Sequence, residues 1–169
     1  MAVTRKPGVA SSGAEGAGTT VEIVAHAHTA AAPAVTWSVL TDHLGMAAWT
    51  PARTVTIEHQ GDPRSAGVGT IRVVSGWPLR LREQIIAVDE PTRIAYRLLS
   101  GLPVRDYVGE TVLREAHAGT DIVWKVTVTP RWPGTAFVLR RVVRGLANGL
   151  AREAGRVAQA GNRRGPSGP

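Results

Sequence analysis

The sequence predicts a single α+β domain in which a curved antiparallel sheet of about seven strands wraps around one long C-terminal helix. Three observations support this fold class. After residue 52, six segments alternate between apolar and polar side chains with a period of two, and short turns separate them. A long segment near the C-terminus has the apolar periodicity of a helix. The length of 169 residues suits one domain with a substantial core.

The elements are expected in a simple order. The stretch Thr20–Ala30 alternates and is rich in β-branched residues, which predicts a first strand. Pro33 suits the first turn of a helix over 33–42, and a short helical turn over 43–49 follows and ends before Pro51. Six further strands are expected at 54–59, 69–75, 79–88, 93–99, 104–115 and 121–129. The gaps between them contain Gly, Pro and Asp and are too short for parallel crossovers, so antiparallel hairpins are expected.

The last predicted element is an amphipathic helix over residues 135–159. One stripe of this helix is apolar and consists of Leu139, Val143, Leu146, Leu150 and Val157. A sheet with one apolar face needs a cover, and this stripe can supply it. Because a large sheet curls around its cover, we expect an internal cavity between the sheet and the helix.

Composition excludes several classes of chemistry. The chain has no cysteine, so disulfides, Cys-ligated zinc, iron–sulfur clusters and thiol nucleophiles are ruled out. No Gly-rich phosphate loop precedes a helix, and we expect no cofactor. Neither a signal peptide nor a membrane span is visible, so we expect a cytoplasmic protein. Residues 1–19 and 160–169 lack apolar periodicity and are predicted to be disordered tails around a ligand-binding domain at 20–159.

Several short motifs occur in order along residues 20–157. They are Ala32-Pro33, Val35–Asp42, Met46–Pro51, Gly67–Thr70, Leu81–Glu83, Val88–Pro91, Ile94–Arg97, Tyr107–Glu110, Gly119-Thr120 and Trp124. Their order and spacing resemble the START/Bet v 1-like (SRPBCC) superfamily, specifically its bacterial polyketide cyclase/dehydrase-type branch. The resemblance implies a helix-grip fold with a pocket for lipids, sterols, polyketides or similar ligands. It does not imply one activity, because the same fold hosts carriers, receptors and cyclases.

An apolar pocket with aromatic lining is the main candidate site. On the last predicted strand, Ile122, Trp124, Val126 and Val128 share one face, which we expect to point inward. The resemblance places Trp49 near the pocket mouth. The residues expected to line the pocket are Trp49, Tyr96, Leu98, Tyr107, Thr111, Trp124, Leu139, Val143 and Leu146. Ordinary core packing would produce the same pattern, so the alternation alone does not distinguish lining from packing.

Acid–base catalysis in the same cavity is the alternative. Arg82 and Glu83 are the catalytic candidates, but strand alternation allows only one of them to point inward and does not decide which. No pair of carboxylates at catalytic spacing is visible. We therefore expect a carrier or sequestering protein for a hydrophobic small molecule, with a polyketide cyclase, aromatase or dehydratase as the alternative.

Two further clusters were considered for metal and anion binding. His26 and His28 share a strand face, but no spacing supports a third ligand, so no metal site is expected. The net charge of +7 lies entirely after residue 130, where eight arginines accompany one glutamate. Arg140, Arg141 and Arg144 form a compact group that would suit weak contact with an anionic membrane surface, as in a peripheral lipid-transfer protein. No nucleic-acid-binding motif is visible, and we expect no nucleic acid partner.

Overall fold

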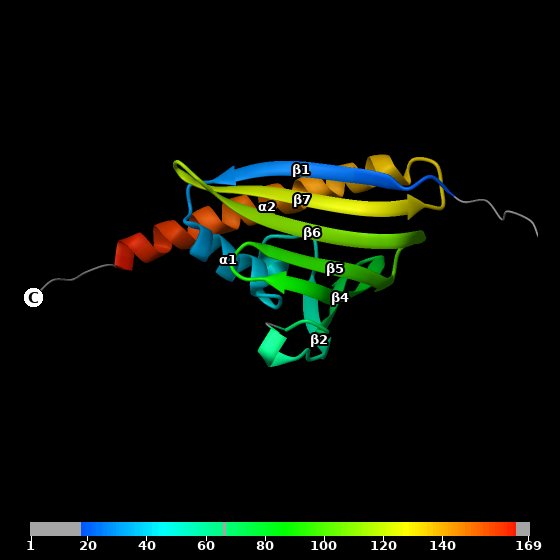
Figure 1. Ribbon diagram of the computed structural model, residues 1–169, viewed down its shortest axis with the longest axis horizontal. Coiled ribbons are helices and arrows are strands. Elements are labelled where there is room, and N and C mark those ends of the chain that lie inside the picture. Colours follow the sequence, from blue (N-terminus) through cyan, green and yellow to red (C-terminus); the bar gives the residue numbers. More distant parts are fainter. Residues whose placement is uncertain (1–17, 66, 165–169) are drawn as a thin grey trace, which may run out of the picture.

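A computed structural model describes residues 18–65 and 67–164, which form one curved antiparallel sheet with a long helix across one face (Figure 1). The strands are β1 (Val21–Thr29), β2 (Thr54–His59), β3 (Ile71–Gly76), β4 (Leu79–Asp89), β5 (Arg93–Ser100), β6 (Val104–Ala116) and β7 (Gly119–Pro130). The helices are α1 (Pro33–Thr41), α2 (Thr135–Arg164) and two short 3₁₀ helices, η1 (Gly45–Ala48) and η2 (Pro63–Ser65). The expected helix-grip fold class is confirmed.

The seven strands lie in the order β1-β7-β6-β5-β4-β3-β2, and every neighbouring pair is antiparallel. Five consecutive antiparallel connections produce most of this order. Four of them are turns of two or three residues, whereas the β2–β3 connection spans residues 60–70 and includes η2. The first strand instead pairs with the last, so β1 lies beside β7 at one edge of the sheet. The segment from α1 to η1 then crosses from β1 to the distant edge strand β2.

Helix α2 packs against β1, β7 and α1. Its buried stripe consists of Leu139, Val143, Ala147, Leu150 and Ala154, spaced by three or four residues as a helix face requires. Leu146 and Val157 pack at the border of this stripe and are half-buried. The helix ends at Arg164, five residues beyond the expected end at residue 159. Residues 160–164 are therefore helical, which corrects the expectation of a disordered tail there.

The inner face of the last strand is the centre of the core. Ile122, Trp124, Val126 and Val128 are each at most 1% exposed, as their alternation predicted. Burial of one such side chain contributes roughly 1.5–3 kcal/mol to stability. These side chains and the apolar stripe of α2 together form the buried interface between the helix and the sheet.

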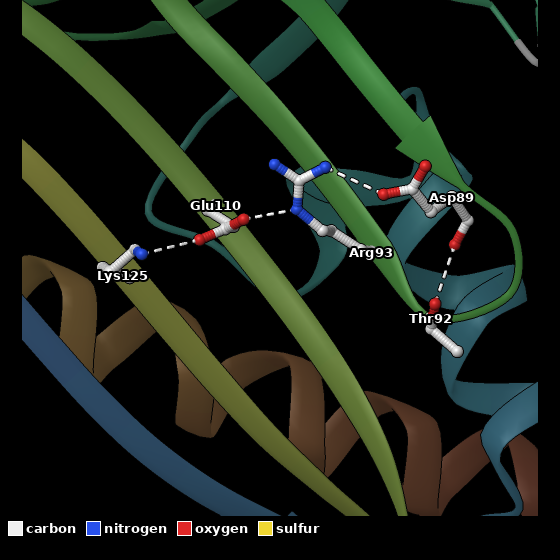
Figure 2. Close-up of polar contacts among 5 residues, drawn as sticks. All are labelled: Asp89, Thr92, Arg93, Glu110 and Lys125. Atoms are coloured by element: carbon white, nitrogen blue, oxygen red, sulfur yellow. Dashed lines mark hydrogen bonds and ion pairs between the residues drawn. The ribbon is translucent and has the colours of Figure 1, made fainter.

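The outer face of the sheet is polar and carries a ladder of ion pairs (Figure 2). Glu110 on β6 lies between Arg93 on β5 and Lys125 on β7 and pairs with both. Arg93 also pairs with Asp89, whose backbone carbonyl accepts a hydrogen bond from the Thr92 hydroxyl in the β4–β5 turn. The hydrogen bond from Arg93 and that from Lys125 lower the pKa of Glu110. This ladder links the four adjacent strands β4 to β7 across the solvent-facing side.

Of the tails predicted at 1–19 and 160–169, residues 1–17 and 165–169 lie outside the described residues, so the division of the chain into a domain and two tails stays a prediction. Within the described part of the chain, no helix is both long and apolar enough to cross a membrane.

Candidate functional site: a polar cluster on the inner face of the sheet

A buried ion pair stands out on the otherwise apolar inner face. Arg72 on β3 and Glu83 on β4 are direct cross-strand partners, and Nε of Arg72 donates to Oε2 of Glu83 at 2.9 Å. Arg72 is 4% exposed and Glu83 is 6% exposed. Charged side chains are almost never buried to this degree unless they are paired, so each residue requires the other.

The structure shows which of the two candidate residues on β4 points inward. Glu83 points inward, whereas Arg82 points outward and forms an exposed ion pair with Glu58 of β2. Arg82 therefore takes no part in the inner cluster. The inward guanidinium belongs to Arg72, which the sequence reasoning had not singled out. A usable signal was present, because pairing Gly76 with Leu79 across the turn places Arg72 opposite Glu83.

Arg72 also connects the cluster to the segment before η1. Its Nη1 lies 3.2 Å from Nδ1 of His43. Since a guanidinium only donates, Nδ1 of His43 accepts this hydrogen bond and Nε2 carries the ring proton. Burial is the main reason that the pKa of His43 is lowered to about 4, the nearby Arg72 charge lowers it further, and Asp42 opposes both effects. His43 is therefore neutral at pH 7.

Tyr96 on β5 lies at the middle of the cluster. The Arg72 guanidinium lies over its ring, 5.0 Å from the centroid, which is a cation–π contact. Its hydroxyl oxygen accepts a hydrogen bond from Nε1 of Trp124 at 3.1 Å. Gly109 on β6 is the direct partner of Tyr96, and a Cβ at Gly109 would lie 2.2 Å from the Tyr96 ring. Glycine at this position therefore allows the tyrosine to lie across β6.

Tyr107 on β6 adds a second phenol beside the first. The two rings are 6.3 Å apart between centroids, and their hydroxyls are hydrogen-bonded. Burial, followed by the charge of Glu83, raises the pKa of Tyr96 to about 12. Burial, followed by Tyr96 and Glu83, also raises the pKa of Tyr107. Both phenols therefore remain protonated at neutral pH and offer hydrogen-bond donors inside the fold.

Thr111 is fully buried on the same face of β6, directly opposite Trp124 of β7. Among the described residues, its Oγ1 is the one buried side-chain polar atom without a hydrogen-bond partner. Burying a hydroxyl without a partner costs about 1–3 kcal/mol, so such an atom calls for an explanation. A group supplied by a ligand would satisfy it.

Trp49 joins this cluster to the surface near α2. Its ring packs edge-on against Trp124, with centroids 6.3 Å apart. A surface cleft of about 490 Å³ lies between the η1 segment and α2, and its lining includes Trp49, Gly145, Gly149 and Arg152. A second cleft of about 450 Å³, on the side of His43, lies between the end of α1 and the β2–β3 connection. Trp49 lines the first cleft and His43 lines the second, so each cleft borders a residue that contacts the inner cluster.

The residues expected to line a pocket fall into two groups. Trp49, Tyr96, Tyr107, Thr111 and Trp124 come together around the polar cluster. Leu139, Val143 and Leu146 instead belong to the core side of α2, a helix that packs against β1, β7 and α1, and Leu98 is half-buried on β5. The role of these residues in ligand binding remains a prediction.

The histidines considered for metal binding lie elsewhere. His26 and His28 are exposed on the outer face of β1, and Nδ1 of His28 lies 2.8 Å from Oδ1 of Asp121 on β7. Within the residues that the structure describes, no group of three or more His, Cys, Asp or Glu side chains is arranged to hold a metal ion.

A curved sheet around a C-terminal helix, with polar groups on its inner face, defines a helix-grip protein. The chain belongs to the family described as "Polyketide cyclase / dehydrase and lipid transport", whose model matches residues 20–158. The family assignment made from the motifs is confirmed. The family has a hydrophobic ligand-binding fold, and its description covers both enzymes and lipid transport.

Solved structures with the same fold are similar over most of the chain. A protein from Nitrosospira multiformis is 21% identical, with a TM-score of 0.68, over 85% of this chain and 100% of that one. The Zhui aromatase/cyclase from Streptomyces sp. R1128 is 24% identical, with a TM-score of 0.68, over 85% and 99%. Ara h 8.0201 is 17% identical, with a TM-score of 0.65, over 80% and 98%. A comparison with curated protein sequences found no match.

Proposed function

We propose that this protein binds a hydrophobic small molecule that carries a hydrogen-bonding oxygen group, such as a lipid or polyketide, and acts as its carrier or sequestering protein. The observation that carries the proposal is the buried hydroxyl of Thr111, which lies opposite Trp124 and has no hydrogen-bond partner among the described residues. Ligand pockets are mostly apolar with a few placed polar groups, and this inner face has that composition.

The chemistry of the cluster favours an oxygen acceptor on the ligand. Arg72, Tyr96, Tyr107 and Thr111 all carry hydrogen-bond donors at neutral pH, and Glu83 is the one carboxylate among them. Since most of the buried side chains around this cluster are apolar, a ligand carbonyl or hydroxyl would find hydrogen-bond partners here. The rest of the ligand would lie against the apolar residues of the inner face.

A matched pair of threonine variants tests this proposal. Thr111→Val removes a hydroxyl that has no partner within the described protein, so the free energy of unfolding should hold or rise. Thr120→Val removes an equally buried hydroxyl that donates to the Ala31 carbonyl at 2.8 Å, and should cost about 1–3 kcal/mol.

The ligand is sought first by native mass spectrometry of the freshly purified protein. A panel of oxygenated apolar compounds is then titrated into the full-length protein, and binding is followed by tryptophan emission. We expect Thr111→Val to weaken binding about five- to tenfold, as loss of one buried hydrogen bond implies, and Thr120→Val to keep the affinity of the folded protein. Absence of binding across the panel, together with no co-purified ligand, would overturn the proposal.

One observation favours a catalytic role as the second candidate. Arg72, Glu83, Tyr96 and Tyr107 converge, which is the arrangement that acid–base work on a poly-ketone would need. In such a ring closure, Glu83 would accept a proton from the carbon next to a carbonyl. Arg72 and a phenol would stabilise the resulting enolate oxygen. The enolate carbon would then form a C–C bond with a second carbonyl carbon, whose oxygen would take up the proton that Glu83 had accepted.

The enzyme candidate is tested with a reactive linear poly-ketone, following ring closure against a boiled control. Tyr107→Phe keeps the ring and removes the hydroxyl, so it should reduce a true catalytic rate while the protein stays folded. Glu83→Gln should abolish it. If the wild-type protein gives no acceleration over the control, the carrier role stands alone. The cytoplasmic location stays a prediction.

A further inference from the structure

One end of the molecule carries large apolar side chains that no other part of the described chain covers. Trp77 in the β3–β4 turn is 90% exposed, and Trp132 in the β7–α2 loop and Phe137 on α2 are each 65% exposed. Phe137 is the only phenylalanine in the chain. Aromatic residues this exposed commonly mark an interaction site.

These residues lie at the same end because of the hairpin order. The β3–β4 turn packs beside the β5–β6 loop, where a Cβ at Gly101 would touch the backbone of Arg80. The β5–β6 loop in turn borders the start of α2, since Leu102 and Phe137 line one apolar groove of about 470 Å³. In Figure 1, the end of β7, the start of β6 and the start of α2 all lie at the right-hand side. We call this set of loops, with the first turns of α2, the docking end.

The docking end is also basic. Arg140, Arg141 and Arg144 follow Phe137 by three, four and seven residues, so they lie near it on the exposed side of α2. Arg131 precedes Trp132 and is exposed as well. Within the described chain, none of these four arginines takes part in an ion pair.

Two exposed carboxylates lie near this end, Asp106 and Glu22, and Glu22 pairs in register with Thr127 close to the end of β7. Asp106 at the start of β6 is exposed and accepts a hydrogen bond from the Thr129 hydroxyl at 3.3 Å. The four arginines outnumber these two carboxylates. A second copy of this chain is a poor occupant for the same surface, because self-association would bring the two arginine groups together.

We propose that the docking end binds the surface of an anionic lipid bilayer. Trp77, Trp132 and Phe137 enter the headgroup region, where aromatic rings are favoured because one part is apolar and the other tolerates water. The arginines bind the anionic headgroups, and each basic residue near such a surface strengthens binding roughly fivefold. Stable attachment to a membrane requires an apolar contact and a basic contact together, and the docking end supplies both.

Vesicle co-sedimentation of the full chain tests the proposal, with neutral phosphatidylcholine vesicles compared with vesicles containing about one third phosphatidylserine. We expect binding to the anionic vesicles that weakens with added salt, and a shift of tryptophan emission to shorter wavelength. Trp132→Ser combined with Phe137→Ser should weaken binding about tenfold or more. Arg140→Gln combined with Arg141→Gln should weaken it roughly 25-fold.

A matched control removes two other exposed arginines, Arg64 in η2 and Arg114 near the β6–β7 turn. Arg64→Gln with Arg114→Gln changes the net charge equally and should leave binding within about twofold. Because all substituted side chains are exposed, each variant should keep the wild-type melting temperature. Equal loss in the control, or unchanged binding in the Trp132/Phe137 variant, would show general polyanion attraction and overturn the proposal. No binding to the anionic vesicles would also overturn it.

Discussion

Arg72 and Glu83 form a buried ion pair across the β3–β4 hairpin, with Nε of Arg72 2.9 Å from Oε2 of Glu83. The hairpin pairs Gly76 with Leu79, and this register sets the two residues opposite one another. The pair in turn connects His43 and Tyr96, which come from a loop and from β5.

Removing one partner of this pair should lower the free energy of unfolding far more than removing both partners. Arg72→Met or Glu83→Leu alone leaves an uncompensated buried charge and should lower the free energy of unfolding by about 3–5 kcal/mol. The double variant replaces both charges by apolar side chains. Its loss of stability should be much smaller than the sum of the losses of the two single variants. Urea unfolding measures all three. The exposed pair Arg82 and Glu58 serves as control, and its variants should change stability little. Additive losses in the buried pair would contradict the prediction.

The stability of the protein should fall as the pH drops from about 6.5 to about 4. The pKa of His43 is lowered to about 4 in the folded protein, so in this window the unfolded chain binds the proton that the folded chain excludes. The resulting loss is up to about 3 kcal/mol.

Unfolding curves at several pH values measure this loss. His43→Gln keeps an acceptor for Arg72 but does not titrate, so its stability should depend less on pH in this window. His117→Gln replaces an exposed histidine and should keep the wild-type dependence. If the His43 and His117 variants show the same dependence, His43 is not its source.

Two glycines of α2 in the same cleft should respond in opposite directions. A Cβ at Gly149 would lie 2.4 Å from the backbone carbonyl oxygen of Trp49, so Gly149→Ala must push η1 away from the helix. A Cβ at Gly145 would meet no atom within 4 Å. Gly145→Ala should therefore stabilise the helix by up to about 1 kcal/mol, whereas Gly149→Ala should lower the melting temperature. Stabilisation by both substitutions would contradict this prediction, because it would mean that η1 shifts away from α2 at little cost in free energy.

A chain that ends before residue 135 should not fold. Removing α2 exposes the inner face of β7 and deletes Leu139, Val143 and Leu150, each of which contributes roughly 1.5–3 kcal/mol through burial. This sum is comparable with the whole net stability of a domain, about 5–15 kcal/mol. Thermal unfolding followed by circular dichroism checks the result. A truncated chain with a cooperative transition would refute the prediction.

Much of the fold was determined by the sequence alone. Alternation on 121–129 identified the inward face of the last strand, and the stripe from Leu139 to Leu150 identified the face of α2 that covers the sheet. These predictions succeed because the period of a strand or helix is local and a large apolar face has only one stable place, the core. The hairpin order follows for the same reason, since short turns permit only antiparallel neighbours.

Only the tertiary structure decided how the polar residues are used. On β4, alternation separates Arg82 from Glu83 but does not say which one points inward, because both are charged and neither has an apolar preference. The contact of Arg72 with His43 joins residues that are 29 positions apart, and no local pattern encodes it. The same holds for Phe137, which is apolar and yet exposed because it lies outside the stripe that the sheet covers. Burial of an apolar face is a local signal, whereas the pairing of charges and the exposure of a surface depend on the whole folded chain.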